Sequence, residues 1–159
     1  MKSTQYFLTP AAGKRLIAKA VIRRLDVQKA LKDATILVIG GTTNAFVANA
    51  LLEAVGTEPC VTFHAFHRGV ALPPGAKLQK AEQLGDLVIE KGVPRFSAPD
   101  KLSEVCSTLK SGDIIFKGAN ALHLSTRTAA VLLGNTENGG TVVEASKAVL
   151  SRRAKLILP

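Results

Sequence analysis

The residues best placed to do chemistry lie in three polar turns, each of which contains glycine and precedes a helical segment or follows an apolar one. The first turn joins a continuous β-branched run to a helical segment. A strand that feeds a glycine turn and then a helix leaves backbone N–H groups unpaired at the positive end of the helix dipole, where phosphate or carboxylate binds. A tight turn whose threonine merely caps the helix fits the same spacing. The residues of this turn are Gly40, Gly41, Thr42, Thr43 and Asn44.

The second turn follows the apolar run 113–116 and contains Lys117 and Gly118, with Asn120 and His123 close behind. Ligands of open parallel sheets bind at the carboxyl ends of the strands, so we expect this turn and the first to face one crevice. Lys117 would then supply a cation there, and Asn120 a polar contact. His123 is the first candidate for proton transfer, because imidazole titrates near neutral pH. The alternative is an ordinary loop histidine.

The third turn comes before the last helical segment and offers another set of backbone donors at Gly139, Gly140 and Thr141. Glu144 lies four residues beyond Gly140, and it is the second candidate for a catalytic role. A helix residue at this offset points either into the crevice or into solvent. A simple connection with an ordinary helix cap would have the same sequence pattern.

Several other chemistries are not predicted. The first turn matches neither the Gly-Lys-Ser/Thr phosphate loop nor the six-residue dinucleotide fingerprint, and the sequence has no Gly-x-Ser-x-Gly elbow. Cys60, His64 and His67 are close in sequence, but on a strand the two histidines would point to opposite faces. No second Cys/His pair follows at the spacing of a zinc site. We therefore predict no metal and no cofactor.

Charge suggests the class of partner. The chain carries 21 Lys and Arg against 12 Asp and Glu, a net charge of +9, which favours anionic partners. Aromatic residues make up only 4% and tryptophan is absent, so there is little material for stacking on bases. We expect a small anionic metabolite, with a nucleic-acid-associated or regulatory module as the alternative and a second copy of the chain as a candidate partner. The basic residues of the first helix form either a solvated face or a rim beside an anion site.

The chain of 159 residues is long enough for one domain with its own core, and we treat residues 1–159 as a single domain. Mean hydropathy is +0.20, yet no apolar run reaches the length of a membrane span, and the N-terminus lacks a signal-peptide stretch. The two cysteines fit reduced thiols of a cytoplasmic protein. The chain stops at Pro159 directly after an apolar strand, so we expect that the natural domain continues.

Hydrophobic periodicity predicts the elements that would position these turns. The first helix begins at Thr9-Pro10, and Leu16, Ile17, Ala20, Val21 and Leu25 would form its apolar face. Further helices are predicted at 45–52, with Gly56 as C-cap, at 100–110 and at 141–153. Strands are predicted at 35–39, 60–66, 86–90, 113–117, 129–133 and 154–158, and irregular structure at 68–85 around Pro73-Pro74-Gly75. This alternation predicts an α/β fold with a mostly parallel sheet covered by helices on both faces.

The order of these segments resembles the superfamily of ribose-5-phosphate isomerase A, glucosamine-6-phosphate deaminase and the CoA transferases. Sugar-phosphate-sensing domains of some bacterial sugar-operon repressors also belong to it. The resemblance rests on residues 14–18 of the first helix, Gly41-Thr42-Thr43, the segment 113–120, and Gly139-Gly140-Thr141 followed by 144–147. It implies a three-layer, Rossmann-like fold and a phosphorylated sugar or CoA-like ligand.

Departures from the family pattern bear on catalysis. In the isomerases, the segment corresponding to 118–123 carries acidic residues, whereas this chain has Asn120 and His123 there. Glu144 stands one residue short of the isomerase glutamate, and the CoA-transferase glutamate has no clear counterpart. The resemblance therefore implies phosphate binding and leaves catalysis undecided, and we expect no isomerisation of ribose 5-phosphate.

Overall fold

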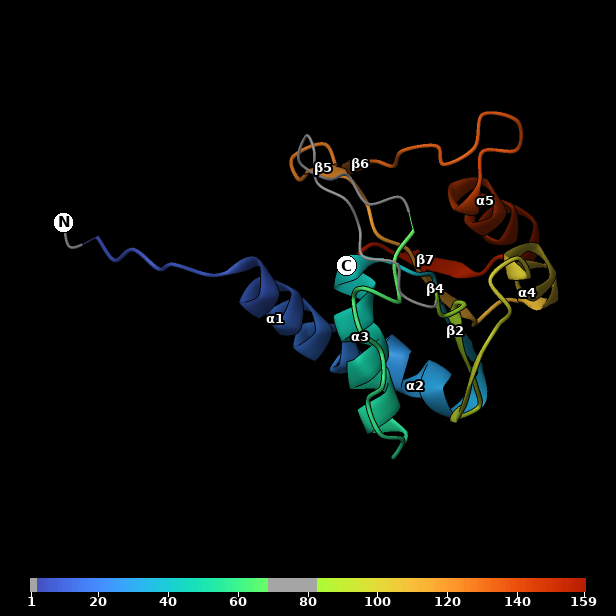
Figure 1. Cartoon of the computed structure of the whole chain (residues 1–159), viewed down its shortest axis with the longest axis horizontal. Coiled ribbons are helices and arrows are strands. Elements are labelled where there is room, and N and C mark those ends of the chain that lie inside the picture. The colour runs from blue at the N-terminus through green and yellow to red at the C-terminus, as the bar shows by residue number, and fades with distance from the viewer. Residues whose placement is uncertain (1–2, 69–82) are drawn as a thin grey trace.

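The computed structural model describes residues 3–68 and 83–159, and it has a mixed α/β fold. The predicted irregular segment around Pro73 lies outside the described residues. In the described part, five helices surround a five-stranded sheet of strand order β3-β2-β1-β4-β7, and a separate two-stranded hairpin stands beside it (Figure 1). None of the described helices is long and apolar enough to cross a membrane.

The main sheet is mixed, which corrects the expectation of a mostly parallel sheet. Strand β1 (Thr35–Val38) pairs in parallel with β4 (Ile114–Phe116), and β4 pairs in parallel with β7 (Lys155–Ile157). On its other side, β1 pairs antiparallel with β2 (Leu87–Glu90), which pairs antiparallel with β3 (Val93–Phe96).

The turn between β2 and β3 explains this antiparallel edge. Only Lys91 and Gly92 connect the two strands, and both have positive φ, 47° and 82°. A two-residue connection of this kind makes a hairpin, because a parallel pair needs a much longer crossover. Strand β3 is not among the predicted strands, although Lys91-Gly92 was a readable turn signal.

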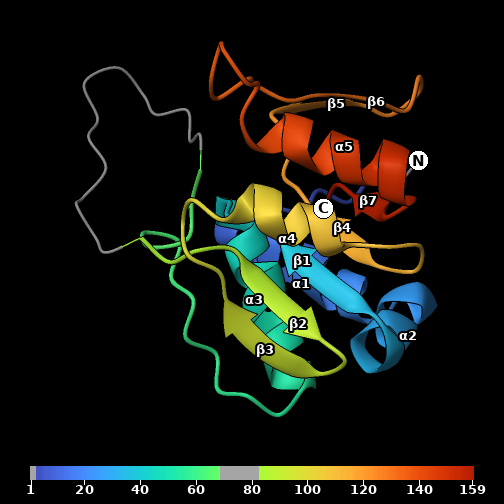
Figure 2. The ribbon, with the colours of Figure 1, turned by 90° about the vertical axis from the view of Figure 1, so that its right-hand side faces the viewer.

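Alternate residues of β1 enter two separate cores. Ile36 and Val38 pack with α1 (Pro10–Ile22), α2 (Leu25–Asp33) and α3 (Thr42–Ala54). Leu37 and Ile39 pack with α4 (Leu102–Thr108) and α5 (Thr141–Arg152). In Figure 2, α4 and α5 lie on one side of β1 and α3 on the other. The continuous apolar run 35–39 is thus buried on both faces, as its composition predicts.

The strand predicted at 60–66 does not form. Thr62 to Phe66 make a turn instead, and the backbone of Val61 bonds to the side chain of Asn49. The Asn49 amide donates to the Val61 carbonyl at 2.8 Å and accepts from its N–H at 2.9 Å. Because one side chain satisfies both backbone groups, this apolar segment needs no neighbouring strand.

The apolar run 129–133 does not join the main sheet either. Its first part lies in β6 (Thr128–Ala130), which pairs with β5 (Ala121–His123) in the two-stranded hairpin. Every residue of both strands is exposed. Composition alone did not distinguish this run from a buried strand.

The buried face of α1 differs from the predicted one. Thr9 caps the helix, accepting a hydrogen bond from the Ala12 N–H at 3.2 Å, so the predicted start is confirmed. Ala18 and Val21 are buried, however, while Leu16, Ile17 and Ala20 are exposed, and Leu25 starts α2 and is exposed as well. The side chains that α1 buries pack within the same core as α3, and a small residue such as Ala18 lets two helices approach closely.

The two cysteines are in opposite environments, which leads to a first prediction. Cys60 is exposed. Cys106 lies on the buried face of α4, where burial raises the pKa of its thiol to about 12, with smaller contributions from Glu144 and Asp86. Since the thiolate is the reactive form, we expect dithionitrobenzoate to label Cys60 rapidly and Cys106 only after unfolding. Absorbance at pH 8 measures this, and Cys60→Ser should remove the fast phase. A fast phase that survives in Cys60→Ser would contradict the burial of Cys106.

Candidate functional site

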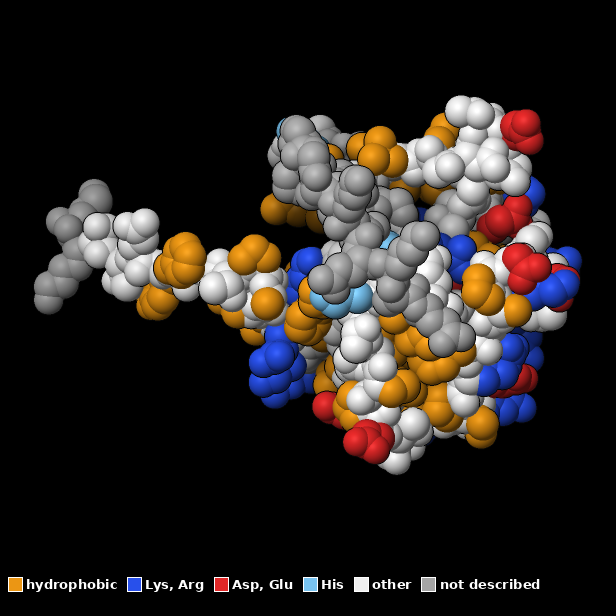
Figure 3. Space-filling model, in the orientation of Figure 1, with side chains coloured by type: hydrophobic (Ala, Val, Ile, Leu, Met, Phe, Trp, Pro, Cys, Tyr) orange, Lys and Arg blue, Asp and Glu red, His pale blue; other side chains and the backbone are white. Residues whose placement is uncertain are grey.

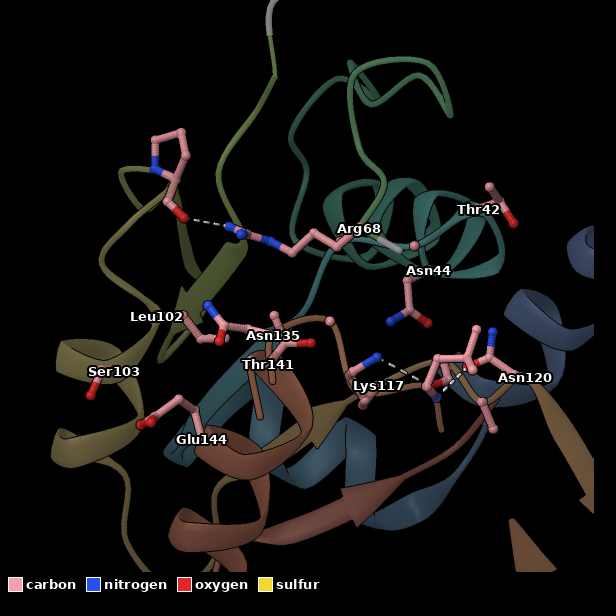
Figure 4. A pocket seen from close by; sticks show the side chains of 18 of the residues that line it. Thr42, Asn44, Arg68, Leu102, Ser103, Lys117, Asn120, Asn135, Thr141 and Glu144 are labelled. Carbon is pink, nitrogen blue, oxygen red and sulfur yellow. Dashed lines mark hydrogen bonds between the residues drawn. The ribbon is translucent and has the colours of Figure 1, made fainter. Parts of the chain in front are cut away.

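The three predicted turns meet in the structure. Residues from all of them line one cleft of about 720 Å³, at the carboxyl ends of β1 and β4 (Figure 4). Arg68 and the start of α4 complete the wall. The lining residues that the sequence singles out are Gly40, Gly41, Thr42, Thr43, Asn44, Lys117, Gly118, Asn120, Gly140, Thr141 and Glu144.

Two predicted site residues are not among those that line the cleft. Gly139 lies just outside the lining, and His123 lies on the exposed hairpin, where its Nδ1 is 2.6 Å from the Thr126 hydroxyl. The structure therefore does not bring His123 together with Lys117 and Glu144. His123 and Lys117 are close in sequence but do not share the cleft, because the chain between them leaves the main sheet and enters β5.

The N-terminus of α3 opens onto the cleft. Gly41 precedes the helix in an extended conformation, φ 178°, and provides no side-chain cap. Within the part of the chain that the structure describes, nothing accepts from the backbone N–H groups of Thr42 and Thr43. These first-turn donors, with the helix dipole behind them, are suited to an anion.

Lys14 links the first helix to the N-terminus of α3. Its ammonium donates a hydrogen bond to the Thr42 hydroxyl oxygen at 2.7 Å. The Thr42 oxygen thus has a donor, and its own hydrogen is free to point elsewhere. Lys14 on α1 thus contacts a residue that lines the cleft, whereas the guanidinium of Arg15 lies 5.9 Å from the centre of the Phe46 ring.

Asn44 fixes the base of the site. It is completely buried, and its amide nitrogen donates to the carbonyl oxygens of Ile39 at 2.7 Å and Phe116 at 3.2 Å. These contacts bind the ends of β1 and β4 to the start of α3. Because the nitrogen must face the two carbonyls, the amide orientation is determined, and its Oδ1 has no partner among the described residues.

Asp86 and Arg68 form a buried pair that the sequence analysis did not single out. The Asp86 side chain is 1% exposed and accepts from the Gly40 N–H at 2.9 Å and from Arg68 Nε at 3.1 Å. Arg68 also donates to the Pro99 carbonyl at 2.6 Å. Burial raises the pKa of Asp86, and the Gly40 N–H and Arg68 partly offset this effect. The pair holds the first glycine turn and the approach to α4 in place. An acidic residue directly before the buried strand β2 was the available sequence signal.

Lys117 lies at the end of β4 and is buried, 8% exposed. Its ammonium nitrogen has one hydrogen bond, to the Gly118 carbonyl oxygen at 3.3 Å. Burial lowers the pKa of Lys117, and Asp86 acts in the opposite direction. Figure 4 shows its side chain directed toward Asn44.

Side chains of the third turn accept hydrogen bonds from the backbone of the same turn. Asn135 accepts from the N–H groups of Glu137 and Asn138, and Asn138 accepts from the Gly140 N–H at 2.9 Å. Gly140 has a positive φ of 63° at the start of α5, so the turn favours glycine there. Through this arrangement the second helix N-terminus also opens onto the cleft.

Glu144 faces the cleft with its charge already partnered. Its carboxylate accepts from Lys147 at 2.8 Å, and this hydrogen bond is the largest cause that lowers the pKa of Glu144. The side of the cleft formed by α4 and α5 therefore carries a carboxylate. An anion is expected on the opposite side, near α3 and β4.

The cysteine and histidines considered for a metal do not gather. Cys60 is exposed, and the ring centroids of His64 and Phe63 are 3.8 Å apart. His67 is buried, and its Nδ1 has no hydrogen-bond partner among the described residues. Within residues 3–68 and 83–159, no group of three or more His, Cys, Asp or Glu is arranged to hold a metal ion.

In comparisons with known proteins, no family model, no curated protein and no solved structure matches this chain.

Proposed function

We propose that this domain binds a small anionic metabolite, a phosphorylated sugar or a CoA-like compound, in the cleft between α3, β4 and α5. The convergence of the three turns on one cleft is the observation that carries the proposal. The phosphate or carboxylate would lie at the N-terminus of α3, where backbone N–H groups and the Thr42 hydroxyl are available as donors. Catalysis stays open in this proposal.

The superfamily suggested by the motifs is part of the same proposal. The two cores on either side of β1 support it, since they fit a three-layer, Rossmann-like arrangement. The antiparallel β2–β3 edge is compatible as well, because α/β sheets commonly carry an antiparallel edge. The site itself, and not the fold, suggests the ligand class.

The second prediction tests the anion site at α3. Replacing both Thr42 and Thr43 by Val removes two hydroxyl donors without removing the backbone N–H groups. We expect ligand binding to weaken by about 1–3 kcal/mol, as is typical of hydrogen bonds to a charged group. Calorimetric titration with ribose 5-phosphate, inorganic phosphate and coenzyme A measures this.

A matched variant separates the effect from a general change of the fold. Thr62 is exposed and does not line the cleft, so Thr62→Val should leave the affinity unchanged. Equal affinity of the wild type and the Thr42→Val/Thr43→Val variant would reduce the turn to a structural connection. Circular dichroism would verify that both variants fold.

Binding to random duplex DNA tests the alternative of a nucleic-acid module. On the face shown in Figure 3, basic side chains gather over α1, while basic and acidic side chains are mixed near α4. We expect weak duplex binding at physiological salt. Nanomolar affinity that falls steeply as salt rises would favour the alternative, because release of counterions governs such binding.

A further inference from the structure

Lys117 is held in surroundings that do not suit an ammonium ion. Among the residues that the structure describes, it forms no ion pair, and the carboxylate that influences it, Asp86, is already paired with Arg68. Its single hydrogen bond, to Gly118, is long at 3.3 Å. A charged lysine that is more than nine-tenths buried would normally have a close anionic partner.

The two helices that begin at the cleft act in the same direction. The N-termini of α3 and α5 both lie at the wall of the cleft that Lys117 lines. The positive ends of their dipoles disfavour a further positive charge beside them. Burial acts in the same direction, since it lowers the pKa of Lys117. A neutral, buried lysine amine is a nucleophile toward carbonyl carbon.

We propose that Lys117 forms an imine with the carbonyl group of a phosphorylated aldehyde whose phosphate lies at the N-terminus of α3. This inference rests on the proposed function, since the α3 site must hold the phosphate. The Lys117 nitrogen attacks the carbonyl carbon and forms the C–N bond. The carbonyl oxygen then leaves as water with the two amine hydrogens, and no oxidant or reductant takes part.

Asn44 is positioned to help this reaction. Its buried amide is fixed by Ile39 and Phe116, its Oδ1 has no hydrogen-bond partner among the described residues, and the Lys117 side chain is directed toward this residue (Figure 4). An acceptor there can hold an N–H of the amine, which leaves the nitrogen lone pair to face the carbonyl carbon. Asn44 is thus a positioning residue for Lys117.

Reductive trapping tests the inference directly. The protein is incubated with glyceraldehyde 3-phosphate and sodium cyanoborohydride, and peptide mass mapping locates the secondary amines that form. We expect Lys117 to be labelled about tenfold faster than the exposed Lys91, because a phosphate bound at α3 would hold the aldehyde carbon near the Lys117 amine. Inorganic phosphate should slow the labelling of Lys117. Glyceraldehyde, which has no phosphate, should lose the preference.

Two variants and one binding measurement make the outcomes distinct. Lys117→Arg and Lys117→Met should abolish the fast labelling, and calorimetry on the wild type measures whether the cleft binds inorganic phosphate. Phosphate binding by the wild type without preferential labelling of Lys117 would overturn this inference and leave the proposed function intact. Absence of both would overturn both, and fast labelling that phosphate does not slow would overturn the placement of the phosphate at α3.

Discussion

Arg68→Ala is expected to lower the stability of the folded protein by about 3 kcal/mol near neutral pH, at the lower end of the range for breaking a buried ion pair. The substitution leaves the buried Asp86 carboxylate with a hydrogen bond from the Gly40 N–H and no ion-pair partner among the described residues. Arg68 retains some contact with solvent, its side chain being 27% exposed, which places the effect at the lower end. For a chain of this size the midpoint of thermal unfolding should fall by about 6–12 °C.

The loss should depend on pH in a defined direction. Burial raises the pKa of Asp86 above its usual value of 3.8, so the folded state binds this proton more tightly than the unfolded state. The contribution of such a group to stability decreases as pH rises through the interval between the two pKa values. Arg68 acts to lower this pKa, so its removal extends the interval upward. The destabilisation by Arg68→Ala should therefore be larger at pH 8 than at pH 5.

Denaturant unfolding at the two pH values measures the effect. Arg95 is an exposed arginine on β3, and Arg95→Ala should change little at either pH. Adding Asp86→Asn to Arg68→Ala removes the buried charge, so the double variant should lose the pH dependence. Equal destabilisation at pH 5 and pH 8 would mean that the pair does not act through the charge of Asp86.

Gly85→Ala should cost about 3 kcal/mol or more, because added volume in a packed site forces the backbone to move. A Cβ at Gly85 would lie 1.6 Å from the Ser97 carbonyl oxygen and 2.6 Å from the Ser97 carbonyl carbon. Backbone atoms cannot turn away as a flexible side chain can. The strain would fall on the neighbouring Asp86, whose backbone bonds to Ser97 and whose side chain holds Gly40.

Thermal unfolding followed by circular dichroism measures this loss. Gly118→Ala is the matched control, since a Cβ at Gly118 would meet no atom within 4 Å and its φ does not require glycine. We expect the control to unfold near the wild-type temperature. A Gly85→Ala variant as stable as Gly118→Ala would contradict the close approach of the β2 and β3 backbones.

Local patterns predicted the elements that form the centre of the protein. The β-branched run 35–39 contains β1, and the run 113–117 contains β4. Helix α3 ends at Ala54 with Val55 as its C-cap, and Gly56, predicted as the cap, follows directly with φ 75°. Backbone propensity and continuous apolar character are enough in these cases, because each strand is buried on both sides by whatever helices follow it. The site turns were found for a similar reason, since glycines and threonines between a strand and a helix mark a helix N-terminus.

Tertiary contacts decided what these patterns left open. The run 60–66 has strand composition, yet the Asn49 side chain satisfies the Val61 backbone and no strand forms. Ala129 and Ala130 lie in the exposed hairpin, Leu132 and Leu133 are exposed beyond it, and His123 goes with that hairpin away from the cleft. These outcomes depend on contacts with residues distant in the sequence. Local hydrophobic periodicity carries no information about such contacts.

The sequence by itself therefore determined that the first and last helices start at Pro10 and Thr141 and that the runs 35–39 and 113–117 contain buried strands. It also singled out three turns as candidate binding segments. Only the tertiary structure decided that these turns share one cleft, that Lys117 is buried there with no ion pair among the described residues, and that Asp86 accepts from the Gly40 N–H while it pairs with Arg68. The physical reason is that helix caps and apolar runs are properties of neighbouring residues. Burial of a charge, and with it the reactivity of an amine or carboxylate, depends on which distant segments exclude water around it.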